Sequence, residues 1–335
     1  MIKNDIIWGD SLTTLKTLDC NTIDVTITSP PYFQQRNYGN ERGIGNEPNL
    51  IEYINNLLAV FSECVRVTKE TGTIVFNLGD KYIDGSLALL PYQFAIKAIE
   101  SKQVFLINQL TWSKLNPTPR HDKCRLIQAT EPFFIFAKSK NYYFNTNNYL
   151  THLDQINKQN KSKPSDKLGK RYFTLIEQAH LTTIQKENAR AALQATILAV
   201  HQGKIDSFRM KIKGIHKEAY GGIEGGRKSQ ICYNGFTIIK ILGNKLKKDV
   251  IESPVETAKN NDHPAIYPLY IIQELIKLLS EEGGIILDPF CGSGTTCVAA
   301  KNLHRRYLGI EINSHYVELA KKRVQQTDLT EELFI

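Results

Sequence analysis

The sequence predicts an α/β fold whose sheet is mostly parallel with an antiparallel edge. Short apolar runs rich in β-branched residues alternate with longer segments in which apolar residues recur every three or four positions. This alternation of strands and helices favours a parallel sheet, because a parallel neighbour needs a crossover connection. Two strand-like runs, 103–112 and 131–138, follow one another without a helix between them and predict an antiparallel pair at the edge.

The first part of the chain supplies most of the predicted strands. Residues 5–10 form a short strand that ends in Gly-Asp, and Ser11 is placed to cap the helix that follows. Asn49 starts a longer helix with a core-facing apolar stripe, which Gly72 closes. The other elements expected here are a strand at 24–28, a strand at 73–80 and a helix at 87–99.

A stiff corner follows the strand at 24–28. The next residues are Ser29-Pro30-Pro31-Tyr32, and the prolines stop the strand because they lack a backbone N–H and fix φ. The corner therefore lies at the carboxyl end of a strand, where open α/β sheets bind ligands. The Ser29 hydroxyl, the Pro30 carbonyl and the Tyr32 ring suit a planar group with an NH2, such as the exocyclic amine of a nucleobase. An ordinary strand-to-turn junction is the alternative.

Two neighbouring features leave alternatives open. Asp10 also follows a strand, so it either faces the same crevice as Ser29 or merely adds a carboxylate to a helix start. Residues 33–48 are rich in glycine and asparagine and exceed an ordinary strand-to-helix connection. They form either a mobile flap beside the corner or a disordered surface loop.

The last quarter of the chain carries a nucleotide-type loop. A helix at 269–279 leads to a strand at 285–288, a loop containing Gly292 and Gly294, and a helix of small residues. Strand, glycine turn and helix in this order allow the backbone to approach a ligand closely. The next strand ends at Glu311, where a carboxylate holds ribose hydroxyls in such sites. A nucleoside cofactor is the favoured interpretation, and a turn formed by Asp288 is the alternative.

Composition limits the class of protein. The 335 residues carry a formal net charge of +8, which is compatible with a polyanionic partner. The six cysteines are scattered without metal-binding spacing, so we expect reduced thiols and no metal. The start of the chain resembles no signal peptide, and no apolar run is long enough to cross a bilayer. These features predict a cytoplasmic protein without a membrane partner.

A basic insert separates the two motif-bearing parts. From about 145 to 248 the chain is rich in lysine, asparagine, glutamine and glycine, with one helix at 182–200 and a glycine-rich stretch at 220–229. The expected boundaries are therefore 1–144, 145–248 and 249–335. The insert suits contact with a nucleic-acid backbone, and a solvated lysine-rich subdomain is the alternative.

The motif order implies a particular sheet. The corner and the nucleotide-type loop share one crevice if the strand of Glu311 lies beside the strand of Asp288, with the strand of Asp10 next outward. Such a sheet is circularly permuted, because the chain ends fall between adjacent strands.

In this order the motifs closely resemble the S-adenosylmethionine-dependent DNA amino-methyltransferases of bacterial restriction–modification systems, in their permuted β group. The resemblance covers roughly residues 5–140 and 249–323. It rests on Gly9-Asp10-Ser11, Thr28-Ser29-Pro30-Pro31-Tyr32, Asn77-Leu78-Gly79-Asp80, Trp112-Ser113-Lys114-Leu115-Asn116-Pro117, His263-Pro264-Ala265 and Asp288-Pro289-Phe290-Cys291-Gly292-Ser293-Gly294-Thr295. It implies a Rossmann-like methyltransferase sheet, a catalytic half before the insert, a cofactor-binding half after it, and target recognition by the insert.

The resemblance also assigns roles to residues. Ser29, Pro30, Pro31 and Tyr32 are the expected catalytic residues. Among the cofactor-binding residues, Glu311 is expected to hold the ribose of S-adenosyl-L-methionine and Asp10 to meet its adenine amine. The full cofactor set is Asp10, Pro264, Asp288, Phe290, Gly292, Gly294, Thr295 and Glu311. The expected contacts to double-stranded DNA are Arg36, Lys114, Asn116, Arg120, Arg227 and Lys228.

The resemblance further implies the target base. A corner that begins with serine is typical of the N4-cytosine enzymes, whereas aspartate or asparagine is typical of the N6-adenine enzymes. We therefore expect transfer of a methyl group to the N4 of a flipped-out cytosine, with a separate restriction endonuclease as a possible partner. N6-adenine methylation is the first alternative, and a non-catalytic DNA-binding module is the second.

Overall fold

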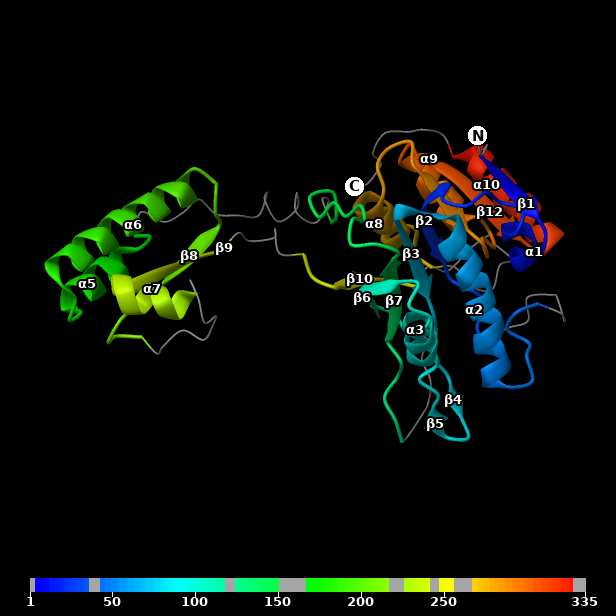
Figure 1. Cartoon of the computed structure of the whole chain (residues 1–335), viewed down its shortest axis with the longest axis horizontal. Helices are drawn as coiled ribbons and strands as arrows, with labels where there is room; N and C mark the ends of the chain where they lie inside the picture. The colour runs from blue at the N-terminus through cyan, green and yellow to red at the C-terminus, as the bar shows by residue number, and fades with distance from the viewer. Residues whose placement is uncertain are drawn as a thin grey trace. The chain divides into compact units, whose positions relative to one another are not determined.

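The computed structural model describes residues 4–35, 43–117, 124–150, 167–216, 226–241, 247–255 and 267–327. The chain divides into two units, one of residues 1–149 with 248–335 and one of residues 150–247 (Figure 1). The predicted glycine-rich stretch at 220–229 lies partly outside the described residues, and its described part begins a helix.

An eight-stranded sheet forms the centre of the first unit. Its strands, in spatial order, are β1 (Asp5–Trp8), β12 (Arg306–Glu311), β11 (Ile285–Asp288), β2 (Ile23–Thr28), β3 (Thr68–Asn77), β7 (Thr130–Ala137), β6 (Phe105–Lys114) and β10 (Val250–Ser253). Only β7 runs antiparallel to its neighbours in this sheet. The predicted mostly parallel sheet is confirmed. The antiparallel strand lies inside the edge, because β6 and β10 add beyond it.

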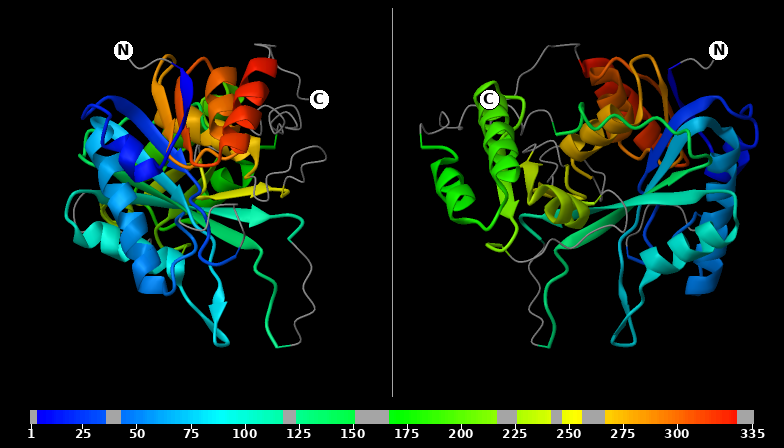
Figure 2. Two further views of the ribbon diagram at one scale, coloured as in Figure 1. Left: turned by 90° about the vertical axis from the view of Figure 1, so that its right-hand side faces the viewer. Right: turned by 60° about the vertical axis from the view of Figure 1, so that its left-hand side comes forward.

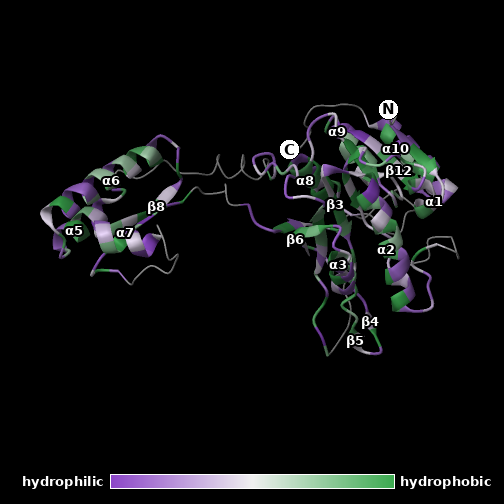
Figure 3. Ribbon diagram, in the orientation of Figure 1, coloured by the Kyte–Doolittle hydropathy of each residue, from purple (hydrophilic) through white to green (hydrophobic). Residues whose placement is uncertain are grey.

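Helices cover both faces of the sheet, as Figure 2 shows. On one face, α1 (Ser11–Leu15), α2 (Leu50–Val67) and α3 (Leu90–Glu100) pack side by side. On the other, α8 (Leu269–Leu279), α9 (Thr295–Asn302) and α10 (Ser314–Gln326) form a second row. Burial of one apolar stripe per helix stabilises this arrangement, and Figure 3 shows apolar and polar residues on different sides of α2.

An aromatic cluster joins the first row of helices to the sheet. The ring of Phe61 on α2 lies 5.3 Å from that of Phe76 on β3 and 5.0 Å from that of Phe136 on β7, both edge-on. Phe94 of α3 stacks on Phe76 at 5.2 Å. Because all four side chains are buried, they hold β3 and β7 together as one rigid layer beside β2, the strand that leads into the Ser29–Tyr32 corner.

Two helix boundaries differ from the expectations. Asp10, not Ser11, caps α1, since its carboxylate accepts a hydrogen bond from the Thr13 amide at 2.8 Å. Ser11 instead points inward and donates to the Pro289 carbonyl at 2.5 Å. The helix capped by Asn49 ends at Val67 rather than at Gly72, because β3 begins at Thr68.

The strand order meets the condition set by the motifs. β12 lies beside β11, and β1 pairs with β12 on the far side. β11 also pairs with β2. These four strands are parallel, so their carboxyl ends, with Asp10, Glu311, Asp288 and Ser29, lie along one edge of the sheet. This is the strand order that we expected for a circularly permuted sheet, and the circular permutation remains a prediction.

The second unit has its own core. Helices α5 (Lys170–Gln178), α6 (Thr183–His201) and α7 (Arg227–Asn234) accompany a two-stranded antiparallel ribbon of β8 (Ser207–Ile212) and β9 (Phe236–Ile241). Ile176, Leu193 and Met210 are buried together. Residues 150–247 contain 18 Lys and Arg against 7 Asp and Glu, a net charge of +11. The remaining residues carry 24 against 27, so the basic charge of the chain is concentrated in this unit.

Candidate active site

The corner after β2 is held by hydrogen bonds on both sides. The Ser29 hydroxyl donates to Oδ1 of Asn77 at 3.2 Å, and the Pro31 carbonyl accepts from the Tyr53 hydroxyl at 2.9 Å. Pro30 is buried. The prolines therefore stop the strand as expected, and the Ser29 side chain is tied to the neighbouring strand β3.

The orientation of Asn77 decides what Ser29 offers to a ligand. The Asn77 amide nitrogen donates to the Pro132 carbonyl at 3.1 Å, so its Oδ1 faces Ser29 and accepts. A serine hydroxyl has one proton and two lone pairs. With the proton directed at Asn77, the lone pairs of Ser29 are available to accept a hydrogen from another group.

Tyr32 is anchored at its ring and at its hydroxyl. The hydroxyl lies 3.0 Å from Oε2 of Glu131 on β7 and 3.2 Å from Oδ1 of Asn77. A Cβ at Gly79 would come within 2.5 Å of the Tyr32 ring, so only glycine leaves room for the ring there. Lys114 of β6 forms an ion pair with the other oxygen of Glu131.

Asp288 organises the end of β11. Its carboxylate is buried and accepts hydrogen bonds from the hydroxyls of Thr28 at 2.6 Å, Thr296 at 2.5 Å and Tyr267 at 2.9 Å, and from the Phe290 amide at 3.1 Å. Burial raises the pKa of Asp288, while these four hydrogen bonds favour the charged form. Asp288 thus joins β2, α9 and the nucleotide-type loop and does much more than form a turn.

Glu311 lies on the opposite side of that loop. Its two carboxylate oxygens accept from the amides of Gly292 and Asn313, each at 2.9 Å. Burial raises the pKa of Glu311. The Gly292 amide thus donates to Glu311, and this hydrogen bond holds the Glu311 carboxylate at the cavity wall.

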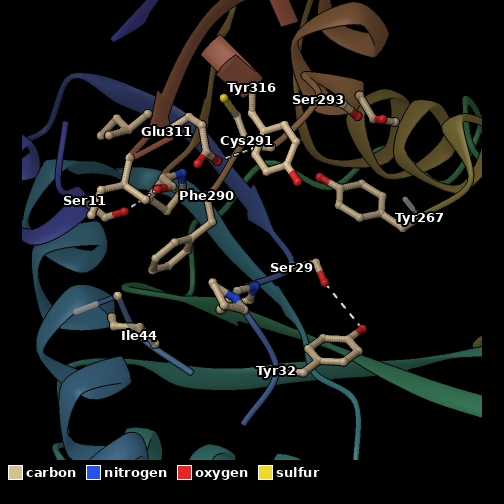
Figure 4. A pocket seen from close by; sticks show the side chains of 18 of the residues that line it. Ser11, Ser29, Tyr32, Ile44, Tyr267, Phe290, Cys291, Ser293, Glu311 and Tyr316 are labelled. Carbon is tan, nitrogen blue, oxygen red and sulfur yellow. Dashed lines mark hydrogen bonds between the residues drawn. The ribbon is translucent and has the colours of Figure 1, made fainter. Parts of the chain in front are cut away.

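One cavity of about 140 Å³ connects these groups. Figure 4 shows Glu311 and Tyr316 at one end, Ser29 and Tyr32 at the other, and Phe290 between them. The apolar wall includes Ile44, Phe290 and Ile312. An apolar slot with an oriented carboxylate at one end fits a nucleoside, whose base needs apolar contact and whose ribose needs an acceptor.

Most of the predicted site residues meet in this cavity. Its lining includes the four corner residues and, of the predicted cofactor set, Asp10, Phe290, Gly292, Thr295 and Glu311. Two members lie behind the wall. Asp288 is buried, and Gly294, with φ at +83°, packs against Ala320 of α10, where a Cβ would come within 2.8 Å. Pro264 lies outside the described residues.

The predicted DNA contacts that the structure describes belong to both units. Lys114 lines the cavity and is paired with Glu131, whereas Asn116 accepts from the Val255 amide at 2.6 Å and joins the loop after β6 to the end of β10. Arg227 and Lys228 begin α7 in the second unit. Arg36 and Arg120 lie outside the described residues, as does the middle of the predicted flap.

The sequence missed several lining residues. Trp112, Glu131, Tyr267 and Tyr316 also face the cavity. Trp112 and Glu131 are directly opposite one another in the β6–β7 register. Their proximity depends on that register, which the sequence does not reveal, although Trp112 begins one of the motifs that carry the resemblance.

Cys291 lines the cavity but is a poor nucleophile. A hydrogen bond with Cys297 and burial raise the pKa of the Cys291 thiol well above its usual value. Within the described ranges, no group of His, Cys, Asp or Glu side chains is placed to hold a metal ion. No helix in the described part of the chain is long and apolar enough to cross a membrane.

A comparison with protein families decides the class of this protein. The profile of the N6/N4 DNA methylase family matches residues 23–322. The chain belongs to this family. Membership confirms the predictions of a DNA amino-methyltransferase of the restriction–modification type and of S-adenosyl-L-methionine as its cofactor, and it favours the enzyme over the non-catalytic alternative.

Individual relatives can be aligned with nearly the whole chain. The Type II methyltransferase M.SmaI of Serratia marcescens is 25% identical over 95% of this chain and 90% of its own length. M.SfiI of Streptomyces fimbriatus is 24% identical over 92% and 88%.

Solved structures share the fold. The PvuII DNA methyltransferase, described as cytosine-N4-specific, superimposes with a TM-score of 0.59 at 16% identity, covering 96% of this chain and 86% of its own. A Thermus thermophilus protein solved with S-adenosyl-L-methionine gives 0.54 at 17% identity, covering 97% and 94%. The Rossmann-like methyltransferase architecture is therefore confirmed.

Proposed function

We propose that this DNA methyltransferase transfers a methyl group to the exocyclic N4 of cytosine in duplex DNA. The observation that carries the proposal is the Ser29 hydroxyl, whose proton points to Asn77 and whose lone pairs can accept from an amine. The corner begins with serine, as is typical of the N4-cytosine enzymes that the chain resembles. The likeness in fold to the cytosine-N4-specific PvuII enzyme is consistent with this target.

The chemistry requires acceptors beside the target nitrogen. The lone pair of a base amine is delocalised into the ring, so the nitrogen is a weak nucleophile. Hydrogen bonds from its two hydrogens to Ser29 Oγ and the Pro30 carbonyl favour a pyramidal nitrogen with a localised lone pair. Acceptors fixed before the reaction also stabilise the positive charge that develops on nitrogen. The Tyr32 ring offers a stacking surface for the extruded base.

The cofactor end of the cavity supplies orientation. When bound, S-adenosyl-L-methionine supplies an electrophilic methyl group on a sulfonium. Glu311 would accept from the ribose hydroxyls, and Phe290 and Ile312, which line the cavity, would contact the nucleoside. Phe290 lies between Glu311 and Ser29, which suits a methyl group presented toward the corner (Figure 4). Such alignment converts a bimolecular reaction into one within a complex and supplies much of the acceleration.

The second unit is the proposed target-recognition part. Its net charge of +11 favours a polyanion, and α7 begins with Arg227 and Lys228. Within a restriction–modification system, a separate endonuclease would share the recognition sequence. Replacing Arg227 and Lys228 with alanine should weaken DNA binding at low salt more than at high salt, because fewer counterions are released.

Mass spectrometry of nucleosides tests the target base. DNA amplified in vitro, which carries no methyl groups, is incubated with the protein and S-adenosyl-L-methionine and then digested. We expect N4-methylcytosine. N6-methyladenine as the only product would refute the cytosine assignment and leave the adenine alternative.

A further inference from the structure

An ion pair in the cavity wall has no part in the reaction described so far. Lys114 and Glu131 are largely buried, with side chains 17% and 12% exposed, and Lys114 contacts one oxygen of the Glu131 carboxylate. The Lys114 ammonium also lies 4.9 Å from the centre of the Trp112 ring. Removing two charges from water is costly, so a buried pair beside a reactive corner calls for a functional explanation.

The pair separates two hollows of the first unit. Tyr32, Lys114 and Glu131 line the active-site cavity and also an adjoining groove of about 390 Å³. The groove is further lined by Lys81, Arg125 and other residues of the β3–α3 and β6–β7 connections. The pair and Tyr32 therefore form a wall whose inner side faces the target amine.

The hydrogen-bond geometry connects this wall to Ser29. The Tyr32 hydroxyl lies near two acceptors, Glu131 Oε2 at 3.0 Å and Asn77 Oδ1 at 3.2 Å. It has a single proton to donate. An ionised carboxylate accepts more strongly than a neutral amide, and here it is also the nearer atom, so the proton goes to Glu131.

With the Tyr32 proton directed at Glu131, Asn77 Oδ1 accepts from the Ser29 hydroxyl. If the Tyr32 proton turned to Asn77 Oδ1 instead, that oxygen would accept from two hydroxyls at once, and its hydrogen bond with Ser29 would weaken. The Ser29 hydroxyl lies 3.4 Å from the Tyr32 oxygen as well, so it could rotate away from Asn77. Its lone pairs would then no longer be held toward the cavity.

We propose that Glu131 is a positioning residue for methyl transfer. Held by Lys114, it takes the Tyr32 proton away from Asn77 and so keeps Ser29 oriented as an acceptor for the target amine. Lys114, which was predicted to contact DNA, balances the charge of Glu131 in this arrangement. The inference rests on the proposed function, because it needs an amine that Ser29 accepts from.

The test is a double-mutant cycle on turnover. Glu131→Gln keeps the shape of the side chain and removes its charge. We expect kcat to fall roughly 10- to 100-fold, the range for a hydrogen bond to a charged group. The affinity for S-adenosyl-L-methionine, measured by calorimetry, should change little, because Glu131 lies at the base end of the cavity. The melting temperature should fall, since the largely buried Lys114 ammonium loses the charge that balances it.

Tyr32→Phe supplies the second side of the cycle. Without the Tyr32 hydroxyl, Asn77 has no second donor from this side chain, so Glu131→Gln should cost little more in the Tyr32→Phe background. Coupling of this kind identifies residues that act through one another. Glu70→Gln is the matched control, since Glu70 pairs with Lys138 at 3.1 Å beside the other end of β7.

The outcomes separate the two proposals. Labelled methyl transfer to DNA amplified in vitro gives kcat for each variant. A wild-type protein that methylates no DNA amine would refute the proposed function and this inference with it. If the wild type methylates DNA and the two losses add, or if Glu131→Gln loses cofactor affinity together with kcat, only the role of Glu131 is wrong.

Discussion

Replacing Glu311 by glutamine should separate cofactor affinity from protein stability. Its carboxylate is half-buried and is anchored by the amides of Gly292 and Asn313, each at 2.9 Å. Glutamine keeps the size and one acceptor but loses the charge. A hydrogen bond from a hydroxyl to a charged acceptor contributes about 1.5–3 kcal/mol, so the dissociation constant of S-adenosyl-L-methionine should rise roughly 10- to 100-fold.

The charged Glu311 carboxylate is expected to destabilise the folded protein, whereas a carboxylate in an ordinary ion pair stabilises it. Because burial raises the pKa of Glu311 in the folded protein, the charged carboxylate opposes folding at neutral pH. This penalty is absent below the pKa of the unfolded chain, about 4.3, and is complete once the pH exceeds the raised folded pKa. The melting temperature of Glu311→Gln relative to wild type should therefore be higher at pH 8 than near pH 4.

Calorimetry and thermal melting measure both quantities on the same samples. Glu318→Gln, an exposed glutamate on α10, controls for loss of charge in this region. Cofactor affinity that is unchanged in Glu311→Gln would contradict the placement of the ribose. A melting temperature that falls more at pH 8 than near pH 4 would contradict the reasoning from burial.

Three further predictions concern the corner and the loop. Ser29→Ala should lower kcat roughly 10-fold or more with cofactor affinity nearly unchanged, and equal loss of both would contradict the separation of the two ends. Gly79→Ala puts a Cβ within 2.5 Å of the Tyr32 ring, so kcat should fall while a crystal structure shows the ring displaced; an unmoved ring would be evidence against it. At pH 8, iodoacetamide should label Cys291 far more slowly than the exposed Cys232, as peptide mapping would reveal, since the Cys291 pKa is raised. Comparable labelling rates would show that the Cys291 thiol is not held neutral.

The sequence predicted those parts of the site that are continuous along the chain. The corner at Ser29–Tyr32 and the loop that ends at Thr295 each consist of neighbouring residues whose backbone restrictions can be read directly. Glu311 was found because it ends the strand after that loop. All three lie in one cavity, except for the buried Asp288 and Gly294 of the loop.

The remaining part depends on pairing between distant segments. Lys114 was predicted to contact DNA from the family resemblance, and its partner in the fold is not visible in the sequence. In the structure, β6 and β7 pair so that Trp112 lies opposite Glu131, which brings Lys114 to the Glu131 carboxylate. A shift of one residue in this register would send Glu131 to the other face of the sheet.

The strand order also has a consequence for synthesis on the ribosome. In the described sheet, β1 has one neighbour, β12, and β2 meets β11 on one side. Both partners are translated after residue 284, so an incomplete nascent chain leaves β1 without a sheet to join and one edge of β2 uncovered. Among the residues at the strand ends that form the site, Glu311 is the last to be synthesised. Methylation competence therefore requires synthesis beyond residue 311, and termination before that residue would yield fragments without a complete cofactor pocket.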